Sequence, residues 1–181
     1  SDGNPNLVNY QEDIYVGYRY YSTFNVKPAY AFGYGLSYTA FDYSEFKLNK
    51  DTLSNKIKVS FKVTNTGSFV GKEAPQLYVS APDGKLEKPA LELKAFGKTR
   101  ELKPGQKETV NFFINPKDLA SFDETTSSWI VEKGTYKFKV GASSADIRGI
   151  LEFKVDDDIV AEVDNDNGPD VQLERLSKFN Q

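Results

Sequence analysis

Two pairs of adjacent carboxylates are the residues of this 181-residue chain whose types best suit acid–base chemistry. Glu12 and Asp13 flank an aromatic run, and Asp123 and Glu124 stand shortly before Trp129, the single tryptophan. Catalysis by two carboxylates needs both groups in one partly buried site, with different pKa values. Adjacent residues on a strand point to opposite faces, so neither pair can converge in that way. We therefore expect neither pair to be catalytic.

The residue types that are missing restrict the chemistry further. The chain has no Cys and no His. Their absence removes disulfides, thiolate nucleophiles, most structural zinc sites and the usual base of a Ser or Cys nucleophile. The "GYG" at Gly33–Gly35 is too short and wrongly placed for a phosphate-binding loop, so we interpret it as a tight turn.

Charge is distributed unevenly along the sequence. Residues 156–181 carry eight acidic residues against Arg175 and Lys178, a net charge of −6, whereas residues 1–155 have a net charge of +3. The net charge of residues 1–155 is too small to indicate a nucleic-acid partner. The acidic run lacks the Gly and the terminal Glu of an EF-hand calcium loop at their required spacing. We interpret residues 156–181 as a flexible acidic tail or linker and expect no metal site.

Length and polarity patterning predict one domain of ordinary size with extensions. No apolar run approaches the roughly 20 residues that cross a bilayer, so we expect no membrane partner. Between about residues 41 and 155, short runs of alternating polarity are separated by Gly, Pro, Asn and Asp. In residues 57–65, for example, apolar side chains alternate with Lys, Ser and Thr, which is typical of a half-buried strand.

Short strands with turn signals about every ten residues predict an all-β fold, an antiparallel sandwich of immunoglobulin or fibronectin type III kind. We expect strands at 41–49, 57–65, 74–80, 93–102, 107–115, 127–133, 135–143 and 149–155. One short helix is expected after Asn115, which can serve as its N-cap with Pro116 at the first helical position. The core-facing residues should include Val59, Phe61, Val63, Val110, Phe112, Ile114, Tyr136, Phe138 and Val140.

Residues 1–40 differ in character from this sandwich. An extended "YQEDIYVGYRYY" (10–21) places Ile14, Val16, Tyr18 and Tyr20 on one face and further tyrosines on the other. A strand that is apolar on both faces belongs inside a covered sheet. Nothing immediately downstream looks like its neighbour, so we expect its partners elsewhere. The "VKPAYAFGYGLSYTAF" that follows mixes Pro, Gly and aromatics, which suits an irregular domain junction.

Several motifs in order carry a resemblance to a known family. "EDIYVGYRYYSTFNVKPAYAFGYGLSYTAFDYS" resembles the C-terminal part of the glycoside hydrolase family 3 β-glucosidases. "VTNTGSFVGKEAPQLYVSAP", "KPALELKAFGKTRELKPGQKETVNF" and "DLASFDETTSSWIVEKGTYKFKVGASSADIR" resemble the fibronectin type III-like domain that ends many members. The resemblance covers roughly residues 10–155, with Asp13 where Gly is usual and Ser22 where Asp is usual.

The resemblance implies three segments. Residues 1–40 would be the end of an α/β sandwich domain, 41–155 the fibronectin type III-like domain, and 156–181 the acidic tail. The resemblance implies that the family's aspartate nucleophile, its acid/base carboxylate and its sugar-binding residues lie upstream of this sequence, so we expect no catalytic and no substrate-binding residue here. The chain would be a non-catalytic, structural portion that packs on and orients the catalytic domains, whether these lie in the same or a second chain. Those domains would hydrolyse β-glucosides with retention and without a cofactor.

Two rival interpretations remain at this stage. Trp129 and the tyrosines near residue 30 could stack on a sugar ring, which would make the chain an independent carbohydrate-binding or adhesion module. A single Trp on a strand of a sandwich is, however, usually a core residue. Arg19 could clamp an anion, although a structural ion pair or an aromatic contact suits it better. A small self-sufficient hydrolase is disfavoured by the missing His and Cys and by the unpaired carboxylates.

Overall fold

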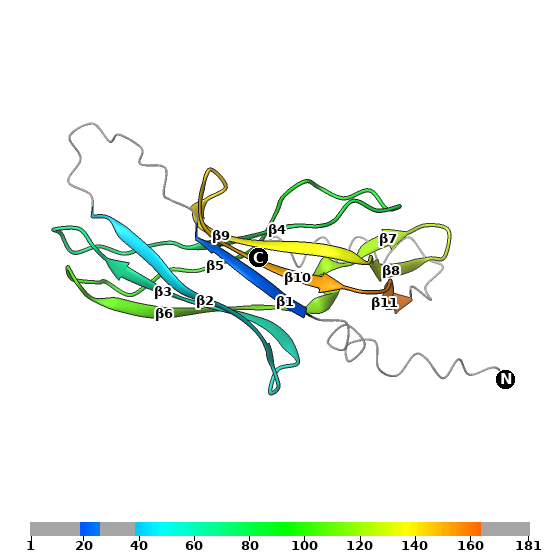
Figure 1. Cartoon of the computed structure of the whole chain (residues 1–181), viewed down its shortest axis with the longest axis horizontal. Coiled ribbons are helices and arrows are strands. Elements are labelled where there is room, and N and C mark those ends of the chain that lie inside the picture. Colours follow the sequence, from blue (N-terminus) through cyan, green and yellow to red (C-terminus); the bar gives the residue numbers. More distant parts are fainter. Residues whose placement is uncertain (1–18, 26–38, 164–181) are drawn as a thin grey trace, which may run out of the picture.

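The computed structural model describes residues 19–25 and 39–163 and confirms an antiparallel β-sandwich (Figure 1). Its strands are β1 (Arg19–Asn25), β2 (Phe41–Asp51), β3 (Lys56–Asn65), β4 (Gln76–Ser80), β5 (Glu92–Phe96), β6 (Lys107–Ile114), β7 (Ser121–Asp123), β8 (Ser128–Val131), β9 (Gly134–Ser143), β10 (Asp146–Val155) and β11 (Ile159–Val163). All eight strands predicted between residues 41 and 155 are present, with shifted ends.

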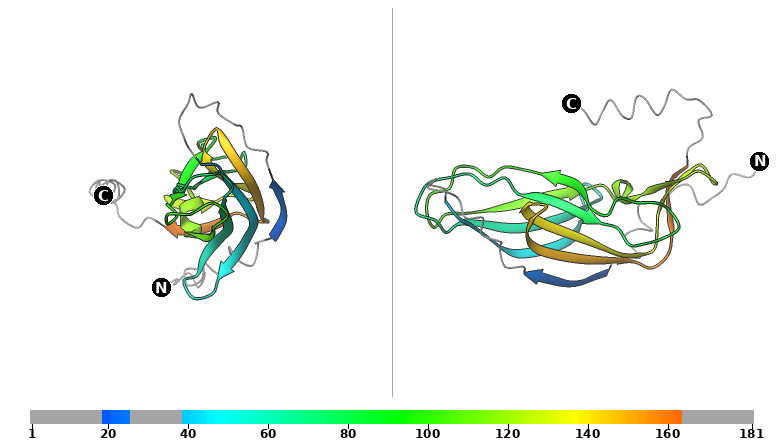
Figure 2. Two further views of the ribbon diagram at one scale, coloured as in Figure 1. Left: turned by 90° about the vertical axis from the view of Figure 1, so that its left-hand side faces the viewer. Right: turned by 90° about the horizontal axis from the view of Figure 1, so that it is seen from above.

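Two sheets form the layers of the sandwich, seen along and across the long axis in Figure 2. One is five-stranded, in the order β1-β10-β9-β4-β5, and the other is three-stranded, in the order β2-β3-β6. A third sheet, β11-β8-β7, lies at one end of the molecule (Figure 1). The alternation of the sequence sets the layers, because a period of two assigns each strand one buried and one outer face.

The core lies between the two main sheets and matches the predicted inward faces. Val59, Phe61 and Val63 of β3 are fully buried, as are the predicted residues of β9. Phe61 lies at the centre of an aromatic cluster, with its ring centroid 5.5 to 5.9 Å from those of Tyr43, Phe46 and Phe112. Burial of such side chains, worth roughly 1.5 to 3 kcal/mol each, is the main force that joins the layers.

The predicted helix is a single 3-10 turn, Pro116–Leu119. The Asn115 side chain accepts a hydrogen bond from the Lys117 N–H at 3.1 Å, as its predicted role as N-cap requires. The turn buries Pro116 and Leu119 and leads directly into β7.

Two strands lie outside the segment that the sequence assigned to the sandwich. β11 falls within the predicted acidic tail and pairs with β8, with Ile159 opposite Val131. β1 pairs with β10, with Arg19 opposite Lys154 and Asn25 opposite Gly149. Part of the segment expected to find its partners elsewhere therefore pairs with the sandwich itself. Ile14, Val16 and Tyr18 lie outside the described residues.

Candidate functional site

The carboxylates singled out from the sequence do not form a site in the described part of the chain. Glu12 and Asp13 lie outside it. Asp123 ends β7, and its Oδ1 accepts the Thr125 N–H at 2.9 Å, which stabilises the turn to β8. Glu124 is exposed in that turn. The local role of Asp123 is therefore that of a turn residue.

Trp129 lies on β8 and is half-buried. Its ring packs on Phe122 of β7, with centroids 5.2 Å apart and an angle of 55° between the ring planes. Its Nε1 is buried and has no hydrogen-bond partner among the residues that the structure describes. Trp129 is not part of the main core cluster, so the expectation of a core tryptophan holds only in part. It supports the β7–β8 hairpin at the end of the sandwich.

The acidic residues that precede β11 show a structural contact as well. Asp156 and Asp157 are exposed, while Asp158 Oδ1 accepts the Lys133 N–H at 2.8 Å. Within residues 19–25 and 39–163, no cluster of three or more acidic, His or Cys side chains is arranged to hold a metal ion. No helix of the described part is long and apolar enough to cross a membrane.

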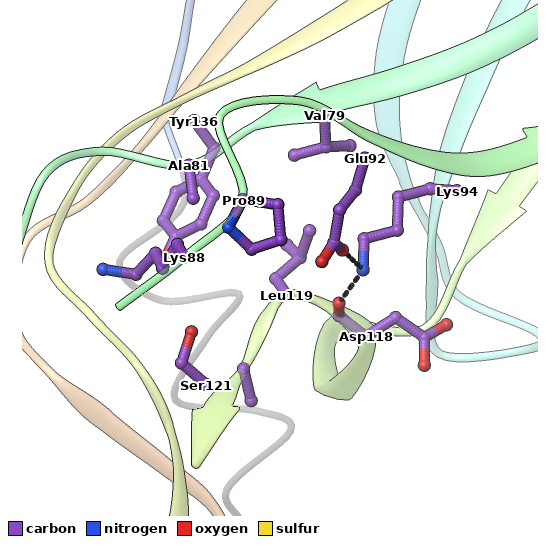
Figure 3. Close-up of a pocket in the computed structure, with 11 residues that line it drawn as sticks. Val79, Ala81, Lys88, Pro89, Glu92, Lys94, Asp118, Leu119, Ser121 and Tyr136 are labelled. Atoms are coloured by element: carbon purple, nitrogen blue, oxygen red, sulfur yellow. Dashed lines mark hydrogen bonds and ion pairs between the residues drawn. The ribbon is translucent and has the colours of Figure 1, made fainter. Parts of the chain in front are cut away.

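A small pocket opens beside the 3-10 turn (Figure 3). Its volume is about 40 Å³, enough for a water molecule but far below the roughly 300 to 1,000 Å³ of small-molecule sites. Lys94 lies at its rim, where its Nζ pairs with Glu92 and donates to the Asp118 carbonyl at 2.7 Å (Figure 3). Lys94 thereby links β5 to the 3-10 turn, and the Glu92 carboxylate balances its charge. A second hollow, of about 270 Å³, lies within the loop 81–90 and has no aromatic residue in its lining.

The most developed polar arrangement is a buried ion pair at the same end. Lys88 Nζ lies 2.5 Å from Glu132 Oε1, and the two side chains are only 8% and 7% exposed. Glu132 also accepts the Lys85 and Leu86 N–H groups at 2.9 and 3.0 Å. Lys88 Nζ donates in addition to the Pro82 carbonyl at 3.2 Å. A buried charge is tolerable only with such a full set of partners.

This ion pair fixes the loop between β4 and β5 to the turn between β8 and β9. A Cβ at Gly84 would lie 2.4 Å from the Glu132 carboxylate, so the loop needs glycine at that position. Tyr136 of β9 donates its hydroxyl to the Glu132 carbonyl at 2.7 Å and ties the pair to the core. Burial opposes the charge on Glu132, but the hydrogen bonds from Lys88 and the loop N–H groups outweigh it and lower the pKa of Glu132.

A second buried polar residue organises the opposite end. Asn65 is fully buried, and its amide donates to the carbonyls of Phe69 and Leu102, both at 2.8 Å. Its Oδ1 accepts the Gly67 N–H at 2.9 Å and the Thr39 hydroxyl. All four hydrogen bonds of the Asn65 side chain are therefore made, and they hold the turn after β3 against Leu102.

Arg148 provides a similar link between the two sheets. It donates two hydrogen bonds to Asp146, at 2.6 and 2.9 Å, and a third to the Phe41 carbonyl at 2.8 Å. Its guanidinium lies 5.3 Å from the ring centroid of Tyr43. Burial, with the nearby Glu73 carboxylate, raises the pKa of Tyr43. Sequence reasoning did not find Glu132, Asn65 or Arg148, because each also contacts a segment far away along the chain, at Lys88, Leu102 and Phe41 respectively.

Comparison with known proteins gives the same architecture. The fibronectin type III-like domain family matches residues 73–144. A β-glucosidase of Kluyveromyces marxianus is 49% identical over 156 residues, which are 84% of this chain and 18% of that protein. Beta-glucosidase BoGH3A of Bacteroides ovatus is 44% identical over 147 residues, 80% of this chain and 20% of that protein.

Solved structures agree with these relatives. β-Glucosidase 3B of Thermotoga neapolitana, in complex with glucose, superposes with a TM-score of 0.61 at 47% identity, over 74% of this chain and 18% of that one. A GH3 β-glucosidase of Bifidobacterium adolescentis gives a TM-score of 0.60 at 34% identity, over 70% of this chain and 18% of that one. The chain spans about a fifth of the length of the relatives it matches. The chain corresponds to the C-terminal, fibronectin type III-like part of the glycoside hydrolase family 3 β-glucosidases.

Proposed function

We propose that the chain packs on the catalytic domains of a family 3 enzyme and holds them in their mutual orientation. The observation that carries this proposal is the ratio of lengths, since this sandwich accounts for only 18 to 20% of relatives that are β-glucosidases. The buried polar groups support it, because Glu132, Asn65 and Arg148 are all used to fix loops and sheets of the domain itself.

The parent reaction is proposed to be the hydrolysis of terminal β-linked glucose with retention of configuration. That chemistry uses two carboxylates about 5 to 5.5 Å apart, one as nucleophile and one as acid/base. We place both in the catalytic domains, which therefore also bind the β-glucoside. This chain contributes the support that keeps those groups in position.

We propose that the chain is divided into the three segments inferred from the sequence. One strand pairing crosses each of the two boundaries between them. Residues 1–40 end an α/β domain, 41–155 form the fibronectin type III-like domain and 156–181 form an acidic tail or linker. β1 joins the first segment to the sandwich through β10, and β11 joins the third through β8. The sandwich is therefore paired with a flanking segment at each of its two proposed boundaries.

Removal of the domain tests the proposal. The enzyme is prepared with and without residues 41–155, and its thermal midpoint and its turnover of an aryl β-glucoside are measured. We expect the shortened enzyme to melt at a lower temperature and to lose turnover. An unchanged melt with unchanged turnover would refute the structural role. In a parallel glucan pull-down, saturable binding by the 181-residue chain alone would favour a carbohydrate-binding module.

A further inference from the structure

The outer face of the five-stranded sheet carries an apolar row that crosses several strands. Leu93 of β5 is opposite Tyr78 of β4, Tyr78 is opposite Lys139 of β9, and Lys139 is opposite Ile150 of β10. Residues opposite each other in a sheet share a face. The neighbouring positions Leu77, Val140 and Leu151 are fully buried in the core, so this row faces outward.

Two members of this face are far more exposed than apolar side chains usually are. Phe96 is 77% exposed and Leu93 is 49% exposed. Phe96 is opposite Gln76, on the same outer face, where Gln76 accepts the Tyr78 hydroxyl. We call Tyr78, Leu93, Phe96 and Ile150, together with Lys139 that lies among them, the apolar row.

The outer face of the three-stranded sheet differs. Its register rows place Ser44 beside Lys62 and Thr109, Lys47 beside Ser60 and Asn111, and Asn49 beside Lys58 and Phe113. Phe113, 46% exposed, is the single apolar residue among them. That face has the composition of a surface in water, which the apolar row does not.

We propose, resting on the structural role above, that the apolar row is the surface on which the catalytic domains dock. The relatives carry about four-fifths of their length outside this region, so protein surface is available to cover it. β1, at the far edge of the same sheet, belongs to the segment proposed to end the α/β domain, so this sheet is continuous with that domain. Interfaces between domains are mixed in this way, with apolar centres and polar rims.

Lys139 adds a chemical requirement for the partner surface. It lies between Tyr78 and Ile150 and has no ion-pair partner among the described residues. Lys137, on the same outer face two residues earlier, already faces Glu152 at 3.9 Å. A docked domain that covers the row must offer Lys139 a carboxylate or a route to water, because a buried unpaired ammonium is strongly unfavourable. The partner is therefore an apolar protein surface that either places a carboxylate opposite Lys139 or leaves its ammonium group a route to water.

Thiol labelling in the full-length enzyme tests this assignment. The chain has no Cys, so Leu93→Cys and Phe113→Cys each add one thiol to it, at positions that are 49% and 46% exposed on opposite faces. Maleimide labelling of each peptide is followed by mass spectrometry in the 181-residue chain and in the enzyme. We expect labelling at position 93 to be at least about tenfold slower in the enzyme, and labelling at position 113 to change by less than about twofold. Phe96→Cys repeats the test if Leu93→Cys impairs folding.

The outcomes separate this inference from the structural role on which it rests. Protection at position 113 alone would overturn the choice of face while leaving docking intact. Equal labelling of both positions in chain and enzyme would overturn this docking face, and the truncation experiment would then show whether the structural role survives. Protection at position 93 in the chain alone that grows with its concentration would identify a second copy as the occupant. Protection produced by added glucan would identify a carbohydrate, and either result would refute the inference.

Discussion

The outer face of the three-stranded sheet and that of the five-stranded sheet present different side chains, although the same alternation builds both. On β3 every second residue enters the core, and the intervening Lys58, Ser60 and Lys62 face outward. On β4 alternation also fills the core, whereas β5 has an irregular register and no fully buried residue, and Tyr78, Leu93 and Phe96 face outward. The alternation of apolar and polar residues therefore specifies the inner faces. The residue composition of each outer face depends on whether water or protein covers that face.

The buried face that the two sheets share gives the largest expected effect. Phe61 is fully buried and contacts three other aromatic rings. We expect Phe61→Ala to lower the free energy of unfolding by about 3 to 5 kcal/mol, because the change leaves a cavity between the sheets. Thermal and denaturant unfolding of the chain would measure it. An unchanged melt would mean that the inner and outer faces of β3 have been interchanged.

The ion pair of Lys88 and Glu132 gives the next largest effect. We expect Lys88→Met to cost about 3 kcal/mol, because Glu132 would remain buried without its cation. The pair of Lys62 and Glu45 provides the control, since its side chains are 38% and 55% exposed. Lys62→Met should change stability far less than Lys88→Met, because water already solvates both charges of the surface pair. Equal effects of the two substitutions in urea unfolding would contradict the distinction between buried and surface pairs.

Acid should weaken the same buried contact. The folded-state pKa of Glu132 lies below its unfolded value of about 4.5, so its contribution is present above that pH. This contribution is lost as the pH falls through the lower, folded-state pKa. We expect the wild-type chain to lose stability below about pH 4.5 more steeply than Glu132→Gln, measured by denaturant unfolding from pH 3 to 7. Parallel pH profiles for the two proteins would show that Glu132 does not contribute.

Substitutions on the two outer faces should have the smallest effect on the chain and a selective effect on the enzyme. Leu93→Ser and Phe113→Ser each remove a half-exposed apolar side chain, so each should change the stability of the isolated chain by about 0.5 kcal/mol or less. In the full-length enzyme, Leu93→Ser should lower the thermal midpoint and Phe113→Ser should not. Equal midpoints for the two enzymes would remove the proposed difference between the faces.

Local patterning explains what the sequence could predict. The alternation in β3 and β9 and the Asn115–Pro116 signal were sufficient to predict two strands, their faces and the single 3-10 turn. The pairing of Lys88 with Glu132 could not be predicted in this way, because 44 residues separate the partners and only the tertiary fold brings them together. β11 was missed because its short apolar run lies within an acidic stretch, whose charge favoured a solvated tail.

The catalytic site could be addressed from the sequence only through resemblance. Asp123 was weighed and set aside because neighbouring strand residues diverge, and in the structure it stabilises the turn to β8. Trp129 shows the limit of assigning burial from residue type. Its place on a short strand at the end of the sandwich leaves it half-buried against Phe122, outside the main core.

Turnover by the purified 181-residue chain is the most direct test of a structural rather than a catalytic role. The chain is incubated with an aryl β-glucoside beside buffer and beside the full-length enzyme. We predict that the chain gives the buffer rate, and that Glu12→Gln and Asp123→Asn leave this rate unchanged. Turnover above buffer that either substitution abolishes would contradict the account, because it would place a catalytic carboxylate within this chain.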